Sequence, residues 1–138
     1  MSGVVRFGIS LDKKLLERFD AQIKSKGYSN RSEALRDLIR DELVRLEWRS
    51  GDDVAGTISL VYDHHTSGLV TRLTDIQHAY PHLIISTQHV HLDHHNCLEI
   101  IVAKGRPREI EKLAAQLKAT RGVKHSSLCM ATTGRNLQ

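Results

Sequence analysis

The sequence predicts an α+β protein made of two parts, a small β-α-α unit followed by a larger β-α-β-β-α-β domain. Apolar residues alternate with polar ones in five short segments and recur at helical spacing in four others. A stretch rich in small and acidic residues separates the first three segments from the rest. We therefore expect domains at residues 1–48 and 55–131, a linker at 49–54 and a tail at 132–138.

The first segment, residues 4–10, has the pattern of a half-buried strand. Val5, Phe7 and Ile9 alternate with Arg6, Gly8 and Ser10. A lone strand is not stable in water, and two short helices make a very small core. Two copies solve both problems, because their strands pair and their four helices share one core. We expect this unit to be an obligate dimer.

Two helices follow this strand. The first begins at Asp12, a favourable N-cap, and ends at Gly27. Ser29 or Asn30 caps the second, and Glu33 stands where a capping box requires it. The apolar stripe of the second helix consists of Ala34, Leu35, Leu38, Ile39, Leu43 and Leu46.

The second domain alternates between strand and helix patterns. Strands are predicted at residues 55–62, 83–92, 97–103 and 121–131, and helices at 67–79 and 107–120. Pro107 suits the first turn of its helix. This order is the ferredoxin-like arrangement, and residues 132–138 are expected to fray.

Composition restricts the class of protein. No apolar run reaches the roughly 18–20 residues of a membrane helix, and residues 1–12 lack the apolar core of a signal peptide. We expect a cytoplasmic protein, in which Cys97 and Cys129 stay reduced. The net charge of +4 indicates nucleic acid only weakly. Residues 1–50 carry eleven Lys and Arg against eight acidic residues.

Histidines are concentrated in one region, since six of the nine lie between His78 and His95. His89 and His91 are two residues apart on a predicted strand, so both face one side. A short loop then brings Cys97 within reach. Imidazole with thiolate suits Zn, Cu, Ni or Fe. Alternatively, the two histidines are simply exposed and Cys97 is a small core residue. A four-ligand site needs one more donor from elsewhere.

Two stretches carry a resemblance to a known family. Residues 27–40, GYSNRSEALRDLIR, and residues 89–105, HVHLDHHNCLEIIVAKG, occur in the order found in nickel-responsive regulators. The chain resembles this family of ribbon-helix-helix transcription factors over nearly its full length. The resemblance implies a ribbon-helix-helix unit followed by an ACT-type metal domain.

The resemblance also implies a ligand set. One Ni(II) per subunit would be held in a square-planar site by His89, His91 and Cys97, with His78 from a neighbouring subunit. Tyr62, His64 and Glu99 match positions around the metal, although Tyr62 also suits an ordinary edge strand. Four other histidines are expected to be solvated, with weak extra metal binding as the alternative: His82, His94, His95 and His125.

The family's paired strands enter the major groove of DNA. The outward residues here are Arg6, Gly8 and Ser10, and Gly8 departs from the family because it has no side chain to read a base. The start of the second helix offers groups to a phosphate, or simply caps the helix: Ser29, Asn30 and Arg31. Glu33 and Asp37 match a potassium site, although both acids suit a solvated surface.

These residues together predict a nickel-dependent repressor, a homotetramer built as a dimer of dimers, that binds double-stranded operator DNA. The alternative is a nickel or copper carrier or storage protein whose N-terminal unit only dimerises it. An enzyme is not expected, because four protein ligands would occupy all the coordination positions of the metal and leave none for a substrate. No nucleophile–base pair is evident either.

Overall fold

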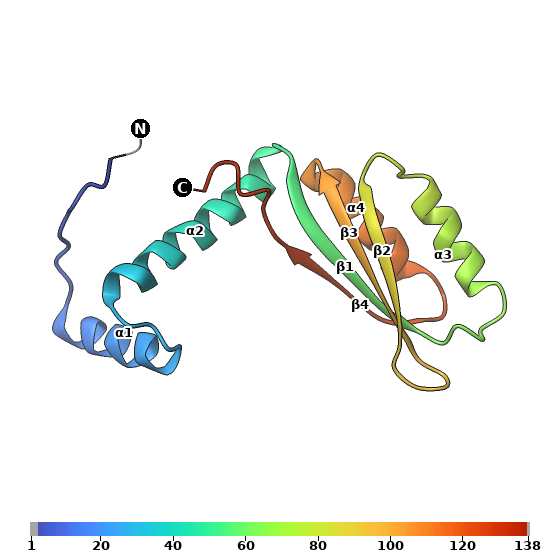
Figure 1. Cartoon of the computed structure of the whole chain (residues 1–138), viewed down its shortest axis with the longest axis horizontal. Coiled ribbons are helices and arrows are strands. Elements are labelled where there is room, and N and C mark those ends of the chain that lie inside the picture. The colour runs from blue at the N-terminus through green and yellow to red at the C-terminus, as the bar shows by residue number, and fades with distance from the viewer. Residues whose placement is uncertain (1–2, 138) are drawn as a thin grey trace. The chain divides into compact units, whose positions relative to one another are not determined.

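The computed structural model describes residues 3–137 and contains two compact units (Figure 1). One unit ends at Arg40 and the other begins at Asp41. Residues 1, 2 and 138, which belong to the predicted first domain and tail, lie outside the described residues. No helix within residues 3–137 is long and apolar enough to cross a membrane.

The N-terminal unit contains α1 (Lys13–Ser25) and the first half of α2 (Arg31–Ser50). Asp12 caps α1 as predicted, because its Oδ1 accepts the N–H groups of the second and third residues of the helix at 2.9 and 3.3 Å. Gly27 follows α1 with φ +80°, a conformation that suits glycine. Asn30 caps α2, since its Oδ1 accepts the Glu33 N–H at 2.9 Å. The Ser29 hydroxyl instead donates to the Glu33 carboxylate at 2.8 Å.

The segment at residues 4–10, predicted to be a strand that pairs with a second copy, is unpaired in the single chain. The segment is extended, but none of its described residues is hydrogen-bonded as a strand (Figure 1). Val4 is 97% exposed and Phe7 is 74% exposed. A strand needs a partner, and within the described part of the chain no segment pairs with this one. The segment borders a groove of 550 Å³ lined by residues of the same unit: Phe7, Ile9, Leu11, Leu15, Leu16, Phe19, Arg31, Leu35 and Leu38.

The C-terminal unit has the predicted β-α-β-β-α-β order. Its elements are β1 (Val54–Tyr62), α3 (Leu69–His78), β2 (Ile84–His91), β3 (Cys97–Gly105), α4 (Pro107–Ala119) and β4 (Val123–Met130). The strands form one antiparallel sheet in the order β2-β3-β1-β4, and α3 and α4 lie on one face of it (Figure 1). The α+β class and the ferredoxin-like arrangement are confirmed.

The core lies between the sheet and these two helices. Alternate residues of β1 and β3 are buried, as a sheet with one covered face requires. Ile58, Leu60 and Ile101 are fully buried and pack with helix residues Leu69, Leu73, Ile110, Leu113 and Leu117. The same covered face continues to Tyr62, Cys97 and Glu99 at one end of the sheet. The core strands thereby position the candidate site.

The second half of α2 belongs to the C-terminal unit and differs from the prediction. The helix continues to Ser50, into the expected linker, and stops before Gly51 at φ +91°. Trp48 is 6% exposed, and its Nε1 donates to the Ala131 carbonyl at 2.8 Å. A Cβ at Gly56 would lie 3.0 Å from the Cys129 carbonyl oxygen and 3.1 Å from the Trp48 ring, so the glycine gives the indole room to pack closely on β1.

The first residue of the predicted tail, Thr132, is held in place by a hydrogen bond. The Thr132 hydroxyl donates to the Glu47 carboxylate at 2.8 Å, and the N–H of the preceding residue donates to the Ala55 carbonyl at 2.9 Å. Residues 131 and 132 therefore continue the attachment of α2 to the sheet and are not frayed.

Candidate metal centre

The strand register gathers five of the predicted metal-site residues on one face of the sheet. Tyr62 lies opposite Cys97 on one side, and His91 lies opposite Cys97 on the other. In the adjacent row, Glu99 lies opposite His89. Residues paired across antiparallel strands point to the same side, so five functional side chains share one end of the sheet.

The His89 ring lies between a thiol and a carboxylate. Its Nδ1 is 4.0 Å from Cys97 Sγ and 3.5 Å from the Tyr62 hydroxyl. Its Nε2 is 3.1 Å from Glu99 Oε1. A neutral imidazole has one N–H and one lone pair, and a carboxylate can only accept. With Nε2–H donating to Glu99, the Nδ1 lone pair faces the thiol, which is the arrangement of a metal-ligating histidine.

Glu99 is a carboxylate in the core, with 3% of its surface exposed. The Tyr62 hydroxyl donates to Oε2 at 3.3 Å, and Gln77 Nε2, from α3, donates to Oε1 at 3.3 Å. Burial and the neighbouring Glu99 charge raise the pKa of Tyr62, so its phenol remains a donor. These donors make a buried charge tolerable, because each satisfies an acceptor site.

His64 and His91 form an imidazole pair beside the group of His89, Cys97 and Glu99. The centroids of their rings lie 5.1 Å apart. The His64 Nδ1 atom is buried and, among residues 3–137, has no hydrogen-bond partner. Burial and the nearby His65 and His91 rings lower the pKa of His64, which favours the neutral ring. Two imidazoles next to a thiol, one of them with an unpartnered nitrogen, fit a transition metal that prefers nitrogen and sulfur.

His78 stands apart from the other three predicted ligands. It is the last residue of α3 and is exposed, and no hydrogen bond joins its ring to His89, His91 or Cys97 in the described chain. The single chain thus places His89 and Cys97 side by side and His91 across from Cys97, and leaves His78 at the surface.

Sequence reasoning missed one further cluster. Within residues 3–137, the only group of three metal-binding side chains with ligand atoms within 4.8 Å of one another is Asp63, His65 and His95. Asp63 and His65 follow β1, and His95 lies in the loop between β2 and β3. The signal that would have found them is the sheet order, because it places both loops at the same end of the sheet.

The predicted DNA-contacting residues fall into two groups. Arg6, Gly8 and Ser10 are exposed in the extended N-terminal segment. Arg31 makes two 2.8 Å hydrogen bonds to the Asp20 carboxylate, which lower the pKa of Asp20. Its guanidinium is therefore engaged within the unit, and Ser29 and Asn30 serve the start of α2.

The predicted potassium residues share one pocket. Glu33 and Asp37 line a 270 Å³ pocket together with Tyr28, Arg36 and Arg40. The Tyr28 hydroxyl donates to Asp37 Oδ2 at 2.7 Å, and Arg40 lies 3.5 Å from Asp37 Oδ1. The pocket brings the two carboxylates together, and Arg40 pairs with that of Asp37.

Comparison with known families decides the class. The family model described as the NikR C-terminal nickel binding domain matches residues 55–131. The model described as ribbon-helix-helix protein, copG family, matches residues 5–46. The chain belongs to the nickel-responsive regulator family.

Relatives of this family match over nearly their whole length, and each is provisionally named a nickel-responsive regulator. The protein of Pyrococcus furiosus is 56% identical over 98% of this chain and 99% of its own. The Chlorobium limicola protein is 57% identical over 97% and 100%, and the Chlorobaculum tepidum protein is 59% identical over 96% and 98%.

Membership confirms several predictions made from sequence. Nickel-responsive regulators act in transcription regulation and are not enzymes. The ribbon-helix-helix domain implies DNA binding and self-association, and the C-terminal domain implies nickel binding.

Proposed function

We propose that this chain is a nickel-dependent repressor that binds double-stranded operator DNA when Ni(II) occupies a site shared between subunits. His89, His91 and Cys97 of one subunit supply three ligands, and His78 of another supplies the fourth. The observation that carries this proposal is the His89 ring, held with Nδ1 toward Cys97 Sγ and Nε2 toward Glu99. Bound nickel would supply the link between the subunits.

Each neighbouring residue has a definite role in this site. Glu99 accepts the Nε2–H of His89 and so fixes the ring with its lone pair toward the metal. Tyr62 and Gln77 hold Glu99 in turn. Three donors are local, and the ion prefers four in a nitrogen-rich set. The exposed His78, at the end of a helix, is available to a second chain.

Two separate apolar surfaces, one half-buried and one exposed, support a homotetramer built as a dimer of dimers. The face of the sheet away from α3 and α4 carries an apolar row on β3: Leu98, Ile100 and Val102. The N-terminal segment and its 550 Å³ groove form the second surface. Each surface buries apolar area when it packs against the same surface of another subunit. Because each chain then makes two different two-fold contacts, the smallest closed assembly has four subunits.

The paired N-terminal segments are the DNA-reading element in this proposal. Arg6 is exposed and able to bind guanine O6 and N7, and Ser10 offers a hydroxyl. The loop after β1, residues 63–68, has no Lys or Arg, so it adds little attraction for phosphate. Nickel and DNA are coupled, so each tightens binding of the other.

A potassium ion between Glu33 and Asp37 completes the proposal. Both carboxylates line the same pocket, and hard oxygen donors suit such an ion. Replacing Asp37 with Asn should abolish any effect of potassium, relative to sodium, on DNA affinity. An unchanged potassium effect in this variant contradicts the assignment.

DNA selection tests the regulator against the carrier. Duplexes from a random library are selected with and without Ni(II), and the affinity of the enriched sequence is measured in both conditions. We expect enrichment of one sequence only with nickel. A carrier would bind Ni(II) with the same affinity and select no sequence in either condition.

Subunit mixing tests whether the site is shared. The variants His78→Ala and Cys97→Ala each lack one ligand. Mixed tetramers contain sites with His78 from one variant and the other three ligands from its partner, so nickel binding should partly recover. His82→Ala is the control, because this exposed histidine lies outside the ligand set. No recovery in the mixture contradicts a shared site.

A further inference from the structure

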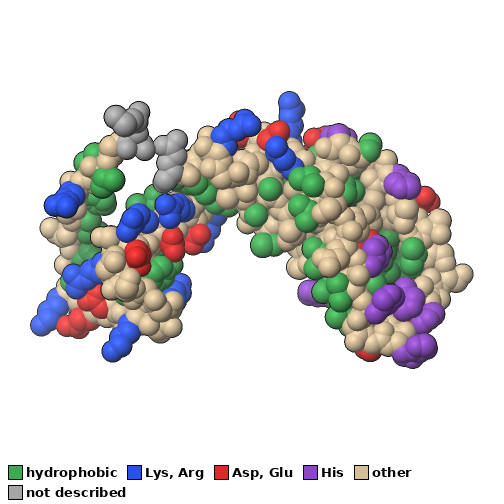
Figure 2. Space-filling view, viewed as in Figure 1, with side chains coloured by type: hydrophobic (Ala, Val, Ile, Leu, Met, Phe, Trp, Pro, Cys, Tyr) green, Lys and Arg blue, Asp and Glu red, His purple; other side chains and the backbone are tan. Residues whose placement is uncertain are grey.

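One charged cavity of the C-terminal unit contains none of the proposed nickel ligands. It has a volume of 480 Å³ and lies where the end of α2, the start of β1, the end of β3 and the C-terminal segment meet. Figure 2 shows Lys and Arg side chains beside Asp and Glu at the end of α2 and the start of β1. The residues that line the cavity are Gly51, Asp52, Asp53, Lys104, Arg106, Thr133, Arg135 and Asn136.

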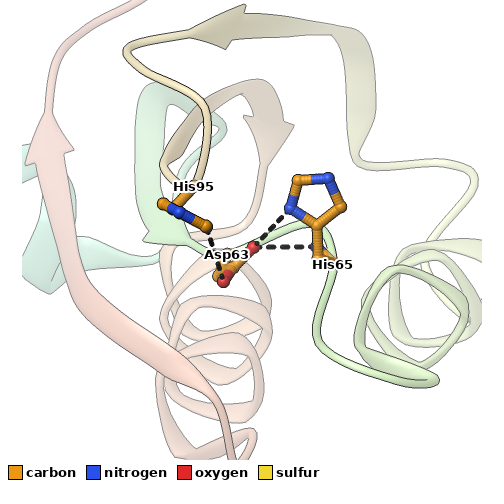
Figure 3. Close-up of side chains that lie close together, drawn as sticks. All are labelled: Asp63, His65 and His95. Atoms are coloured by element: carbon orange, nitrogen blue, oxygen red, sulfur yellow. Dashed lines mark hydrogen bonds and ion pairs between the residues drawn. The ribbon is translucent and has the colours of Figure 1, made fainter.

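The charged side chains of this cavity are unpaired. Three basic and two acidic side chains line it, and none of the five makes a side-chain hydrogen bond or ion pair with residues 3–137. At the other end of the sheet, by contrast, Asp63 lies 3.2 Å from His65 and 3.9 Å from His95 (Figure 3). Like charges that share a cavity repel one another, so three unpaired cationic groups favour an anion that neutralises them.

We propose that this cavity, the anion pocket, binds the phosphate group of a small phosphorylated molecule that also carries hydroxyl groups. Lys104, Arg106 and Arg135 supply the positive charge. An arginine guanidinium can donate two parallel N–H bonds to a phosphate, and a lysine ammonium acts as a point charge. Thr133 and Asn136 add a hydroxyl and an amide to the same cavity.

The two acidic residues determine which phosphate compound the pocket accepts. The carboxylates of Asp52 and Asp53 can only accept hydrogen bonds, so they repel a second anionic group and accept hydroxyl donors. Carboxylates hold the ribose hydroxyl of dinucleotides in the same way. A cavity of 480 Å³ is also within the range of small-molecule sites, about 300–1,000 Å³. These features favour a sugar phosphate over inorganic phosphate.

The first turn of α4 adds to the attraction for an anion. A neighbouring cavity of 420 Å³ shares Gly51 and Arg106 with the anion pocket and is completed by Pro107, Arg108 and Glu109. The N-terminus of a helix carries partial positive charge, and no side chain caps this 13-residue helix. The basic side chains make the site, and the helix strengthens their field.

The backbone around the anion pocket is already ordered. The first residue of β1 pairs with the last residue of β3, and the Lys104 N–H donates to the Leu83 carbonyl at 2.8 Å. In the C-terminal segment, the Gly134 N–H donates to the Thr132 hydroxyl at 3.0 Å, and the Leu137 N–H donates to the Gly134 carbonyl at 3.2 Å. Because these segments are fixed before a ligand binds, the entropy cost of binding is lower.

This inference does not rest on the proposed function. The anion pocket has no residue in common with the nickel ligands, the DNA-contacting residues or the pocket of Glu33 and Asp37. Binding to it can therefore be measured on the full chain without nickel or DNA.

Isothermal titration calorimetry of the full chain with ribose 5-phosphate tests the proposal, with inorganic phosphate and ribose as comparison probes at the same ionic strength. Wild type should bind ribose 5-phosphate more tightly than either comparison probe. Arg106→Gln and Arg135→Gln should each weaken this binding by about 3–10-fold, because each removes a charge-assisted contact. Asp53→Asn should tighten the binding of inorganic phosphate and so reduce the preference for the sugar phosphate.

The matched pair of variants is Lys104→Gln and Lys112→Gln. Lys112 is also an exposed lysine of the C-terminal unit, on α4, but it does not line the cavity. Only Lys104→Gln should weaken the binding of ribose 5-phosphate. Equal weakening by both variants overturns the proposal, because the attraction would then come from the overall charge. Absence of binding, or equal affinity for inorganic phosphate and ribose 5-phosphate in wild type, overturns it as well. Circular dichroism checks that each variant is folded.

Discussion

Replacing Glu99 with Gln tests the orienting role of this carboxylate. The substitution keeps the side-chain shape but replaces the charged acceptor for His89 Nε2–H by a neutral amide. The buried carboxylate also accepts from Tyr62 and Gln77, and Gln offers only one oxygen in place of two. Loss of the partner that orients a metal-bound imidazole lowers metal affinity by about 10–100-fold, or about 1.4–2.7 kcal/mol.

In the assay, the protein and a chelator of known affinity compete for Ni(II). The intensity of the thiolate charge-transfer band measures how much nickel the protein holds. Glu111→Gln is the matched control, since it removes the same charge from an exposed position on α4. We expect Glu99→Gln to weaken nickel binding while Glu111→Gln does not. Equal nickel affinity in Glu99→Gln and wild type would refute the role assigned to Glu99.

Three further predictions concern other parts of the chain. Arg6→Ala should weaken binding to the selected DNA by about 1–3 kcal/mol in a gel-shift titration and leave nickel affinity unchanged; equal DNA affinity would mean that another element reads the sequence. Trp48→Phe removes the hydrogen bond to Ala131 and part of a buried ring, so urea denaturation at fixed protein concentration should show a loss of about 1–3 kcal/mol, whereas an unchanged midpoint contradicts this packing. Hydrogen bonds from Asn96 and His95 lower the pKa of Asp93 from 3.8 to about 2. Its stabilising effect is therefore complete above pH 3.8 and disappears as the pH falls toward 2, and a carboxyl NMR titration with an ordinary midpoint would exclude these bonds.

Local signals in the sequence predicted most elements correctly. The caps at Asp12 and Asn30 depend on neighbouring backbone groups, and the strands and helices of the C-terminal unit follow from periodicity. The closeness of His89 and Cys97 follows from one short loop between paired strands. Such features require no knowledge of distant parts of the chain.

Contacts between distant segments were not predictable in this way. Trp48 and Ala131 are 83 positions apart, and no local pattern relates them. Asp63 and His95 meet only because β1 pairs with β3, and β3 pairs with β2. The segment at residues 4–10 has the alternation of a strand, but among residues 3–137 no segment pairs with it.

The uncovered apolar side chains of Val5, Phe7 and Ile9 also matter for how much working protein a cell contains. A newly synthesised subunit has an N-terminal segment that is prone to aggregation and accessible to proteases until it pairs with a second subunit. At low expression, the yield of paired subunits rises with the square of the subunit concentration. When synthesis falls, the concentration of paired DNA-binding units therefore falls faster than the concentration of total polypeptide. A steady supply of chains is as necessary for the response as the metal.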